Sequence, residues 1–368
     1  MSPARKIRVL VVDDSAVVRR MISDALAADP EIEVVGTACD PYVARDKILA
    51  LNPDVLTLDI EMPRMDGLTF LKILQQHRPM PVVVVSSHTQ AGSRAAMEAM
   101  ELGAVDVLAK PQSAWHLGEL REQLALRVKG AAGARLKNFA AQTPRAAVTT
   151  SSSAQFSPRQ LVLIGASTGG TEAIKNVLTR LPDRLPGICI VQHIPPVFSK
   201  TFAERLNEYC AFEVREAEPG DELKSGLALV APGDQHLTLA WTGAAYRVAL
   251  QRGPLVHHVR PAVDVMFESA VGAGKNTLAV LLTGMGRDGA AGMKKLKTAG
   301  ATTLAQNEET CVVYGMPRAA VELGAVERVL PLDLIPHAIL HALQNHSEIR
   351  PSPICPDANQ LIKHTQSL

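Results

Sequence analysis

The sequence predicts two α/β domains, and three observations lead to that prediction. The chain has 368 residues, which is long for a single hydrophobic core and suits two domains of ordinary size. Short runs of Val, Leu and Ile alternate with amphipathic stretches in both halves of the chain. Residues 129–158 between the halves are rich in Ala, Gly, Ser, Thr and Gln. Such a segment buries too little apolar surface to offset the entropy lost on ordering, so we expect a flexible linker there.

The composition narrows the class of protein. The chain is 47% hydrophobic and 20% charged with a formal net charge of +1, so it lacks the basic excess typical of proteins that bind nucleic acid or anionic membranes. Neither a signal peptide nor an apolar run long enough to span a membrane is evident. The cysteines are scattered and suit reduced thiols: Cys39, Cys189, Cys210, Cys311 and Cys355. We expect a soluble, cytoplasmic monomer with no nucleic-acid partner and no membrane insertion.

The first domain, residues 1–128, alternates strand and helix five times. Strands are predicted at residues 7–13, 32–38, 54–60, 81–87 and 104–111. Helices are predicted to begin at Ser15, Pro41, Gly67 and about Gln90, with a last helix after the fifth strand. Nearly continuous apolar strands must be buried on both faces, and parallel neighbours need a crossover between them. We therefore predict a flavodoxin-like domain with a five-stranded parallel sheet.

The second domain, residues 159–346, contains another alternating series. Strands are predicted at residues 161–167, 187–194, 227–233, 246–251, 276–286 and 301–307. Helices are predicted from about Thr171, over about residues 199–209 and from Asp288. This pattern predicts a doubly wound α/β domain. The polar tail at residues 347–368 gives no functional signal.

Polar residues at the strand ends of the first domain predict an acidic pocket. Asp13 and Asp14 end the first strand, Asp59 the third, Ser86 the fourth and Lys110 the fifth. The carboxyl ends of parallel strands lie at one edge of the sheet, so these side chains should converge. Grouped carboxylates need a cation, and their oxygens suit Mg²⁺, which we assign to Asp14 and Asp59. Asp59 is then the nucleophile that forms an acyl phosphate, while Lys110 and Ser86 interact with the new negative charge.

These strand ends, with the stretch DIEMPRMDG at residues 59–67, resemble the response-regulator receiver family from residue 6 to about 128. The resemblance implies that a histidine kinase supplies the phosphoryl group. It also implies that the second domain is the regulated output.

Three strand ends of the second domain carry residues typical of a catalytic triad. Ser167 lies in LVLIGASTGG, His193 in IVQHIPP and Asp288 in LLTGMGRDG. A serine hydroxyl needs a base at neutral pH, and an imidazole serves best when a carboxylate fixes its tautomer. Backbone N–H groups after Ser167 and around Met285 would hold the oxyanion. The rival histidines are His236, His257 and His258, since a lone histidine beside a strand is more often structural than catalytic, and the rival acids are Asp234 and Asp264.

Other readings of the second domain are weaker. Gly165, Ser167 and Gly169 match the G-x-S-x-G elbow, but the order Ser, His, Asp differs from that of α/β-hydrolases. A noncatalytic phosphate-binding loop would need the lysine and Ser/Thr of a P-loop or a full dinucleotide fingerprint, and neither is present. A DNA-binding output domain would need a basic recognition helix, which we do not find.

GASTGG, QHIPP and GMGRDGA, in this order over residues 160 to about 345, resemble the chemotaxis protein-glutamate methylesterases, the CheB family. The resemblance implies that Ser167 is the nucleophile, His193 the general base and acid, and Asp288 its orienting partner, with Thr168 and Met285 lining a site that needs no cofactor. It implies hydrolysis of glutamate γ-methyl esters on methyl-accepting chemotaxis receptors, with release of methanol, and deamidation of receptor glutamines. It further implies that the unphosphorylated first domain covers the catalytic cleft.

Overall fold

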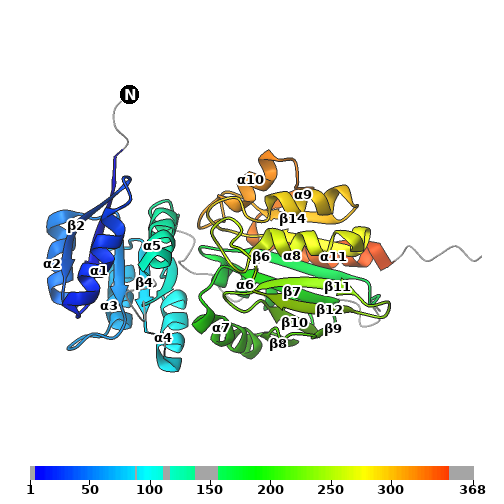
Figure 1. The fold of residues 1–368 in the computed structure, drawn as a ribbon, viewed down its shortest axis with the longest axis horizontal. Coiled ribbons are helices and arrows are strands. Elements are labelled where there is room, and N and C mark those ends of the chain that lie inside the picture. The colour runs from blue at the N-terminus through cyan, green and yellow to red at the C-terminus, as the bar shows by residue number, and fades with distance from the viewer. Residues whose placement is uncertain (1–4, 88, 111–116, 137–155, 348–368) are drawn as a thin grey trace, which may run out of the picture.

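The computed structural model describes residues 5–87, 89–110, 117–136 and 156–347. These form two α/β domains that lie side by side, with α4 (Gln90–Glu101) and α5 (Leu117–Ala132) of the first domain facing the second (Figure 1). The α/β class predicted for both halves is confirmed.

The N-terminal domain is a parallel five-stranded sheet in the order β2-β1-β3-β4-β5. Its strands are β1 (Ile7–Val12), β2 (Ile32–Ala38), β3 (Val55–Asp59), β4 (Val82–Ser86) and β5 (Asp106–Ala109). The crossovers contain α1 (Ala16–Ala27), α2 (Pro41–Leu51), α3 (Gly67–His77) and α4. Every residue of β3 and β4 is buried, as expected for central strands covered by helices on both faces. The predicted flavodoxin-like topology is confirmed.

Short polar side chains fix where three of these helices begin. Ser15 accepts a hydrogen bond from the Val18 N–H, Asp66 from the Thr69 N–H, and Asp40 from the first N–H groups of α2. Each cap satisfies backbone donors that a helix start leaves without partners. Ser15, Asp40 and Asp66 lie in the loops that leave the carboxyl ends of β1, β2 and β3. The caps therefore hold these loops in place at the edge of the sheet where the acidic residues lie.

The C-terminal domain is built on a parallel seven-stranded sheet in the order β15-β14-β13-β6-β7-β10-β8. Its strands are β6 (Leu161–Ala166), β7 (Gly187–Gln192), β8 (Glu213–Glu216), β10 (Leu227–Val230), β13 (Thr277–Leu281), β14 (Thr302–Gln306) and β15 (Arg328–Leu330). Its helices are α6 (Gly170–Leu178), α7 (Pro196–Tyr209), α8 (Val263–Ser269), α9 (Ala290–Thr298), α10 (Met316–Glu322) and α11 (Ile335–Ser347), with 3₁₀ turns η3 (Val271–Asn276) and η4 (Leu332–Leu334). The central strands β6, β7 and β13 are wholly buried. Helix α7 begins three residues before the predicted start because Pro196 occupies its first turn, where no N–H partner is required.

One part of this domain differs from the predicted doubly wound pattern. Residues 246–251 do form a strand, β12 (Tyr246–Gln251), but it pairs antiparallel with β11 (His236–Trp241) and β9 (Glu222–Leu223) in a separate sheet. The burial of β12 alternates over its first four residues, as expected of a sheet with one face exposed to solvent. The short alternating run could not be assigned to a particular sheet from sequence.

The start of the predicted linker is wrong. Helix α5 continues to Ala132, and Lys129 forms ion pairs with Asp29 and Glu31 of the N-terminal domain. Beyond the helix, the Arg135 N–H donates to the carbonyl of Val312 in the C-terminal domain. The composition of residues 130–134 predicts a flexible segment, but these small side chains allow close packing of the helix end. The remainder of the predicted linker, residues 137–155, and the tail from 348 lie outside the described residues.

The two domains are joined by direct contacts from α4. The Ser93 hydroxyl donates a 2.8 Å hydrogen bond to the carbonyl of Val197 at the start of α7. At the other end of α4, Glu101 forms ion pairs with Lys175 and Arg205, at 2.7 and 2.5 Å. The N-terminal domain is therefore held against α6 and α7, the helices that follow β6 and β7.

Candidate active site and phosphorylation site

The structure brings the three predicted triad residues to one edge of the seven-stranded sheet. Ser167 directly follows β6, His193 directly follows β7, and Asp288 lies in the turn between β13 and α9. Strand β6 pairs with both β7 and β13, so the three residues leave neighbouring strands at their carboxyl ends. This is the edge at which open parallel sheets bind ligands.

The imidazole and the carboxylate of this group form a well-defined pair. His193 Nε2 donates to Asp288 Oδ2 over 2.8 Å, and both side chains are buried. The carboxylate also accepts hydrogen bonds from the backbone N–H groups of Val263, at 2.6 Å, and Asp264, at 2.9 Å. Burial alone would raise the pKa of Asp288, but the hydrogen bonds and the nearby imidazole hold it below its ordinary value. The acid is therefore kept ionised, as the partner of a catalytic histidine must be.

Backbone contacts hold Ser167 tightly. Its N–H donates to the carbonyl of Thr283, and its carbonyl accepts from the Gln192 side chain and from the Gly170 N–H. A Cβ on Gly284 would lie only 2.7 Å from the Ser167 Cβ, so glycine is required there for the loop after β13 to approach the serine. Among the described residues, the Ser167 hydroxyl makes no hydrogen bond to His193. Such contacts commonly tighten only when substrate binds.

Two backbone N–H groups are available beside the serine. Those of Thr168 and Met285 donate no hydrogen bond within the described part of the chain. Thr168 follows Ser167 directly, and Met285 lies on the loop that packs against it through Gly284. Donors of this kind can stabilise an oxyanion without any reorganisation during the reaction.

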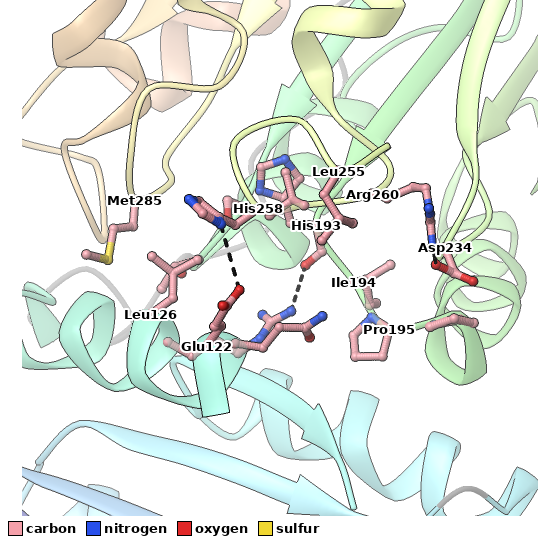
Figure 2. Close-up of a pocket in the computed structure, with 16 residues that line it drawn as sticks. Glu122, Leu126, His193, Ile194, Pro195, Asp234, Leu255, His258, Arg260 and Met285 are labelled. Atoms are coloured by element: carbon pink, nitrogen blue, oxygen red, sulfur yellow. Dashed lines mark hydrogen bonds and ion pairs between the residues drawn. The ribbon is translucent and has the colours of Figure 1, made fainter. Parts of the chain in front are cut away.

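A cavity of about 400 Å³ opens over Ser167, Thr168 and His193. The C-terminal domain contributes Met285, Ile194, Pro195 and the loop carrying His258 and Arg260 (Figure 2). The other wall is α5 of the N-terminal domain, which contributes Glu122, Gln123, Leu126 and Arg127. The cavity thus lies between the two domains, and α5 restricts access to it.

The rival histidines and acids all have other partners. His257 Nε2 donates to Asp264 Oδ2 over 2.8 Å, and His236 bonds through Nε2 to the carbonyl of Pro254. Asp234 accepts from the guanidinium of Arg260. Asp264 lies next to the triad, since its own N–H donates to Asp288, but its carboxylate faces His257 and the Gly292 N–H. The structure therefore does not place any of these in contact with Ser167.

The predicted acidic pocket of the N-terminal domain is also assembled. Lys110 Nζ lies 2.9 Å from Asp13 Oδ2 and 2.8 Å from Asp59 Oδ2, and both carboxylates are fully buried. Burial raises the pKa of Asp59 to about 6, although the hydrogen bond from Lys110 works in the opposite direction. Ser86 ends β4 and donates from its hydroxyl to the carbonyl of Gly92 in α4.

The donor set in this pocket fits a hard divalent cation. Asp13, Asp14 and Asp59 each offer an oxygen, and these atoms all lie within 4.8 Å of one another. Asp14 is exposed, so water could complete the coordination shell, as Mg²⁺ commonly requires. Asp14 and Asp59, the predicted ligands, therefore lie together with Asp13.

Sequence reasoning missed the residues of the N-terminal domain that reach the candidate active site. Asp106 begins β5, and its carboxylate accepts a 2.9 Å hydrogen bond from the Thr168 hydroxyl while pairing with the Arg127 guanidinium. Both Asp106 and Arg127 are buried. A charged residue at a strand start within an otherwise apolar run was the available signal, but nothing in sequence indicates a partner in another domain.

No helix in the described part of the chain is long and apolar enough to cross a membrane. The family model for the response regulator receiver domain matches residues 9–122, and that for CheB methylesterase matches residues 162–339.

Several proteins named protein-glutamate methylesterase/protein-glutamine glutaminase are similar over nearly the whole chain. One from Syntrophus aciditrophicus is 52% identical over 91% of this chain and 98% of its own. Others from Bdellovibrio bacteriovorus and Salmonella typhimurium are 48% and 50% identical, each over 94% of this chain and 99% of its own. The chain therefore belongs to the protein-glutamate methylesterase/protein-glutamine glutaminase family, in which a receiver domain precedes a CheB methylesterase domain.

Proposed function

We propose that this protein hydrolyses glutamate γ-methyl esters on chemotaxis receptors and that phosphorylation of its receiver controls this activity. The observation that carries the proposal is the His193–Asp288 pair beside Ser167, at the carboxyl ends of neighbouring strands, with Ser167 and His193 both lining one cavity. The relatives' names supply the substrate, a glutamyl or glutaminyl side chain of a protein. We also propose a cytoplasmic location.

The proposed reaction has two halves. Ser167 Oγ attacks the γ-carbonyl carbon while its proton passes to His193. Because Nε2 is bound to Asp288, Nδ1 is the nitrogen that accepts this proton. The resulting oxyanion is held by the N–H groups of Thr168 and Met285. Collapse breaks the bond to the methoxy oxygen, which takes the proton from His193 and leaves as methanol.

Water completes the cycle by the same route. It loses a proton to His193 and attacks the glutamyl ester on Ser167, and the second oxyanion collapses to release the glutamate carboxylate and the serine hydroxyl. Deamidation differs only in the first leaving group, because ammonia departs in place of methanol. Buried Asp288 stabilises the imidazolium in both halves, and its lowered pKa keeps it from taking the proton itself.

Phosphorylation of the receiver regulates the esterase activity. Asp59 accepts the phosphoryl group from a histidine kinase, and Lys110 and Ser86 neutralise and bind the new oxygens. Asp13, Asp14 and Asp59 would hold Mg²⁺, which supplies charge neutralisation at the phosphoryl oxygens when bound. Ser86 now donates to Gly92 of α4, and α4 carries Ser93 and Glu101 at the domain contact. A change at Asp59 is thereby linked to the contact that keeps the domains together.

The decisive test is methanol release from a methylated receptor. Ser167→Ala should abolish release while phosphorylation of Asp59 continues at the wild-type rate, which shows that the receiver domain of the variant is folded. Substantial residual release would refute the serine assignment.

Asp59→Asn should keep the basal rate and lose stimulation by a small phosphodonor. Equal stimulation of the variant and the wild type would refute the regulatory assignment.

A further inference from the structure

A second pair of an imidazole and a carboxylate lies next to the His193–Asp288 pair. His257 Nε2 donates to Asp264 Oδ2 over 2.8 Å, the same distance as between His193 and Asp288. Asp264 is buried, with 4% of its surface exposed. The proposed reaction uses neither His257 nor Asp264. A carboxylate is costly to take out of water, so a buried one outside the reaction calls for a physical reason.

The backbone of Asp264 contacts the proposed triad, and its side chain fastens that backbone in place. The Asp264 N–H donates to Asp288 Oδ1 over 2.9 Å, beside the Val263 N–H, which donates to Oδ2 over 2.6 Å. The Asp264 carboxylate in turn accepts from the Gly292 N–H over 2.6 Å. Gly292 lies in the first turn of α9, the helix that follows Asp288 in the chain. The contacts therefore close a ring from Asp288 to the start of α8, across to α9, and back along the chain to Asp288.

Close packing fixes where α8 begins. A Cβ on Gly165 of β6 would lie 2.3 Å from Val263 Cγ1, and a Cβ on Gly289 would lie 2.8 Å from the same atom. Glycine at both positions leaves room for the first residue of α8. A Cβ on Gly292 would lie 3.0 Å from the carbonyl oxygen of Asp264, so α8 and α9 also touch closely. Packing thus sets the position of α8, and the bond from Gly292 to the Asp264 carboxylate sets its orientation.

His257 favours the charged form of this carboxylate. An oxygen of Asp264 lies within 4.8 Å of an oxygen of Asp288. Burial raises the pKa of Asp264, and the Asp288 carboxylate raises it further, whereas the Gly292 N–H and His257 lower it. An ionised carboxylate accepts a stronger hydrogen bond from the Gly292 N–H than a neutral acid does. The imidazole therefore strengthens the bond that fastens α8 to α9.

The turn that carries His257 has an unfavourable backbone conformation. Val256 and Val259 exchange backbone hydrogen bonds of 3.2 and 3.0 Å, and His257 and His258 between them have φ angles of 53° and 62°. Such angles favour glycine or asparagine and persist in other residues where surrounding contacts hold them. The hydrogen bond to Asp264 is such a contact for His257.

We propose that His257 and Asp264 are positioning residues that hold Asp288 in place for catalysis; this inference rests on the proposed function. Asp264 acts on Asp288 through its backbone N–H and on α9 through its carboxylate, and His257 supports that carboxylate. Both residues act through Asp288 and not on the substrate. Their loss should therefore slow the chemical step without weakening receptor binding.

The first test measures kcat and KM for methanol release by full-length enzyme saturated with phosphodonor. Asp264→Asn should lower kcat about tenfold at constant KM, the loss expected when a hydrogen bond loses its charged partner. His257→Leu should lower kcat by a similar factor. His257→Gln should restore most of that loss, because a carboxamide can still donate to Asp264.

Glu268→Gln is the matched control for this test. Glu268 also joins α8 to α9, through an ion pair with Lys295, but it is exposed and lies near the end of α8. Its kcat should match that of the wild type. A comparable loss for Glu268→Gln, equal losses for His257→Gln and His257→Leu, or an unchanged kcat for Asp264→Asn would overturn the proposal. The His257 side chain is 34% exposed, so its variants keep the test available where Asp264→Asn does not fold.

The second test separates positioning from a general loss of stability. The proton between His193 Nε2 and Asp288 should give a downfield resonance in the proton NMR spectrum, identified by its absence from His193→Gln. Asp264→Asn should shift this resonance because the accepting carboxylate is held differently, and Glu268→Gln should leave it in place. A lower kcat with an unshifted resonance would place the effect of Asp264 outside the triad and overturn the proposal. The proposed function fails separately, if methanol release survives Ser167→Ala.

Discussion

The carboxylate of Asp106 in the receiver accepts a 2.9 Å hydrogen bond from the hydroxyl of Thr168, the residue after the proposed nucleophile. Both side chains are buried, and the Arg127 guanidinium that pairs with Asp106 also donates to the carbonyl of His193, at 3.5 Å. One buried ion pair of the receiver thus contacts two strand ends of the candidate active site, through the side chain of Thr168 and the backbone of His193.

Asp106→Asn should raise the unstimulated rate of methanol release by up to about tenfold. The amide keeps a hydrogen-bonding atom near Thr168 but loses the charge, and this loss weakens the hydrogen bond by at most about 1.5 kcal/mol, which corresponds to roughly tenfold. The rate under saturating phosphodonor should be unchanged. Asp54→Asn is the matched control, because that carboxylate binds Arg5 and the Arg8 N–H within the receiver. A lower unstimulated rate for Asp106→Asn would show that the receiver contact assists catalysis.

Asp288→Asn should lower kcat by roughly 10⁴-fold. An asparagine cannot stabilise the imidazolium and can impose the wrong tautomer on His193. Steady-state kinetics of methanol release will measure the loss. Asp333→Asn is the control, because it removes a carboxylate of η4 that pairs with Arg180, after the end of α6. A loss below about tenfold would mean that another group orients the histidine.

Glu101→Gln should make the unstimulated activity less sensitive to salt. Glu101 joins α4 to Lys175 and Arg205 across the domain boundary, and all three side chains are about one-quarter exposed. Partly exposed ion pairs weaken with ionic strength, so the wild-type rate should rise two- to three-fold between low and high salt. The variant should begin near the high-salt rate and change little. Arg318→Gln breaks a pair confined to α10 and should behave as the wild type does.

Asp59→Asn should stabilise the protein at neutral pH. The folded-state pKa of Asp59 is about 6, above the ordinary value of 3.8, so the folded wild type binds the proton more tightly than the unfolded chain. Its stability therefore falls as pH rises from about 4 to above 6, by about 3 kcal/mol at most. The variant lacks this titration.

Urea unfolding with a chelator present will test this pH dependence. The advantage of Asp59→Asn over the wild type should be largest near pH 7.5 and decrease toward pH 4.5. The loss of one partner for Lys110 will reduce the advantage at every pH without changing that trend. An advantage that grows on acidification would contradict a raised pKa for Asp59.

Much of the site could be predicted because strand ends are local features. Asp13, Asp59 and Lys110 each follow an apolar run, and parallel pairing alone brings such ends together. The same reasoning located Ser167 and His193. Their partner Asp288 was selected from several acids by its glycine-rich turn, and the structure adds the reason it is held: two N–H groups at the start of α8. Nothing within the turn itself indicates those donors, which come from residues 263 and 264.

The sequence by itself determined the two α/β domains, the acidic pocket and the three strand ends that carry Ser167, His193 and Asp288. Hydrophobic periodicity and chain order are sufficient for these, because each depends on neighbouring residues or on parallel pairing. The tertiary structure alone decided that α5 covers the cavity, that Asp106 reaches Thr168 and that His258 faces Glu122. These contacts join residues far apart in the chain through the docking of two separately built domains, and no local pattern encodes the relative orientation of two such surfaces.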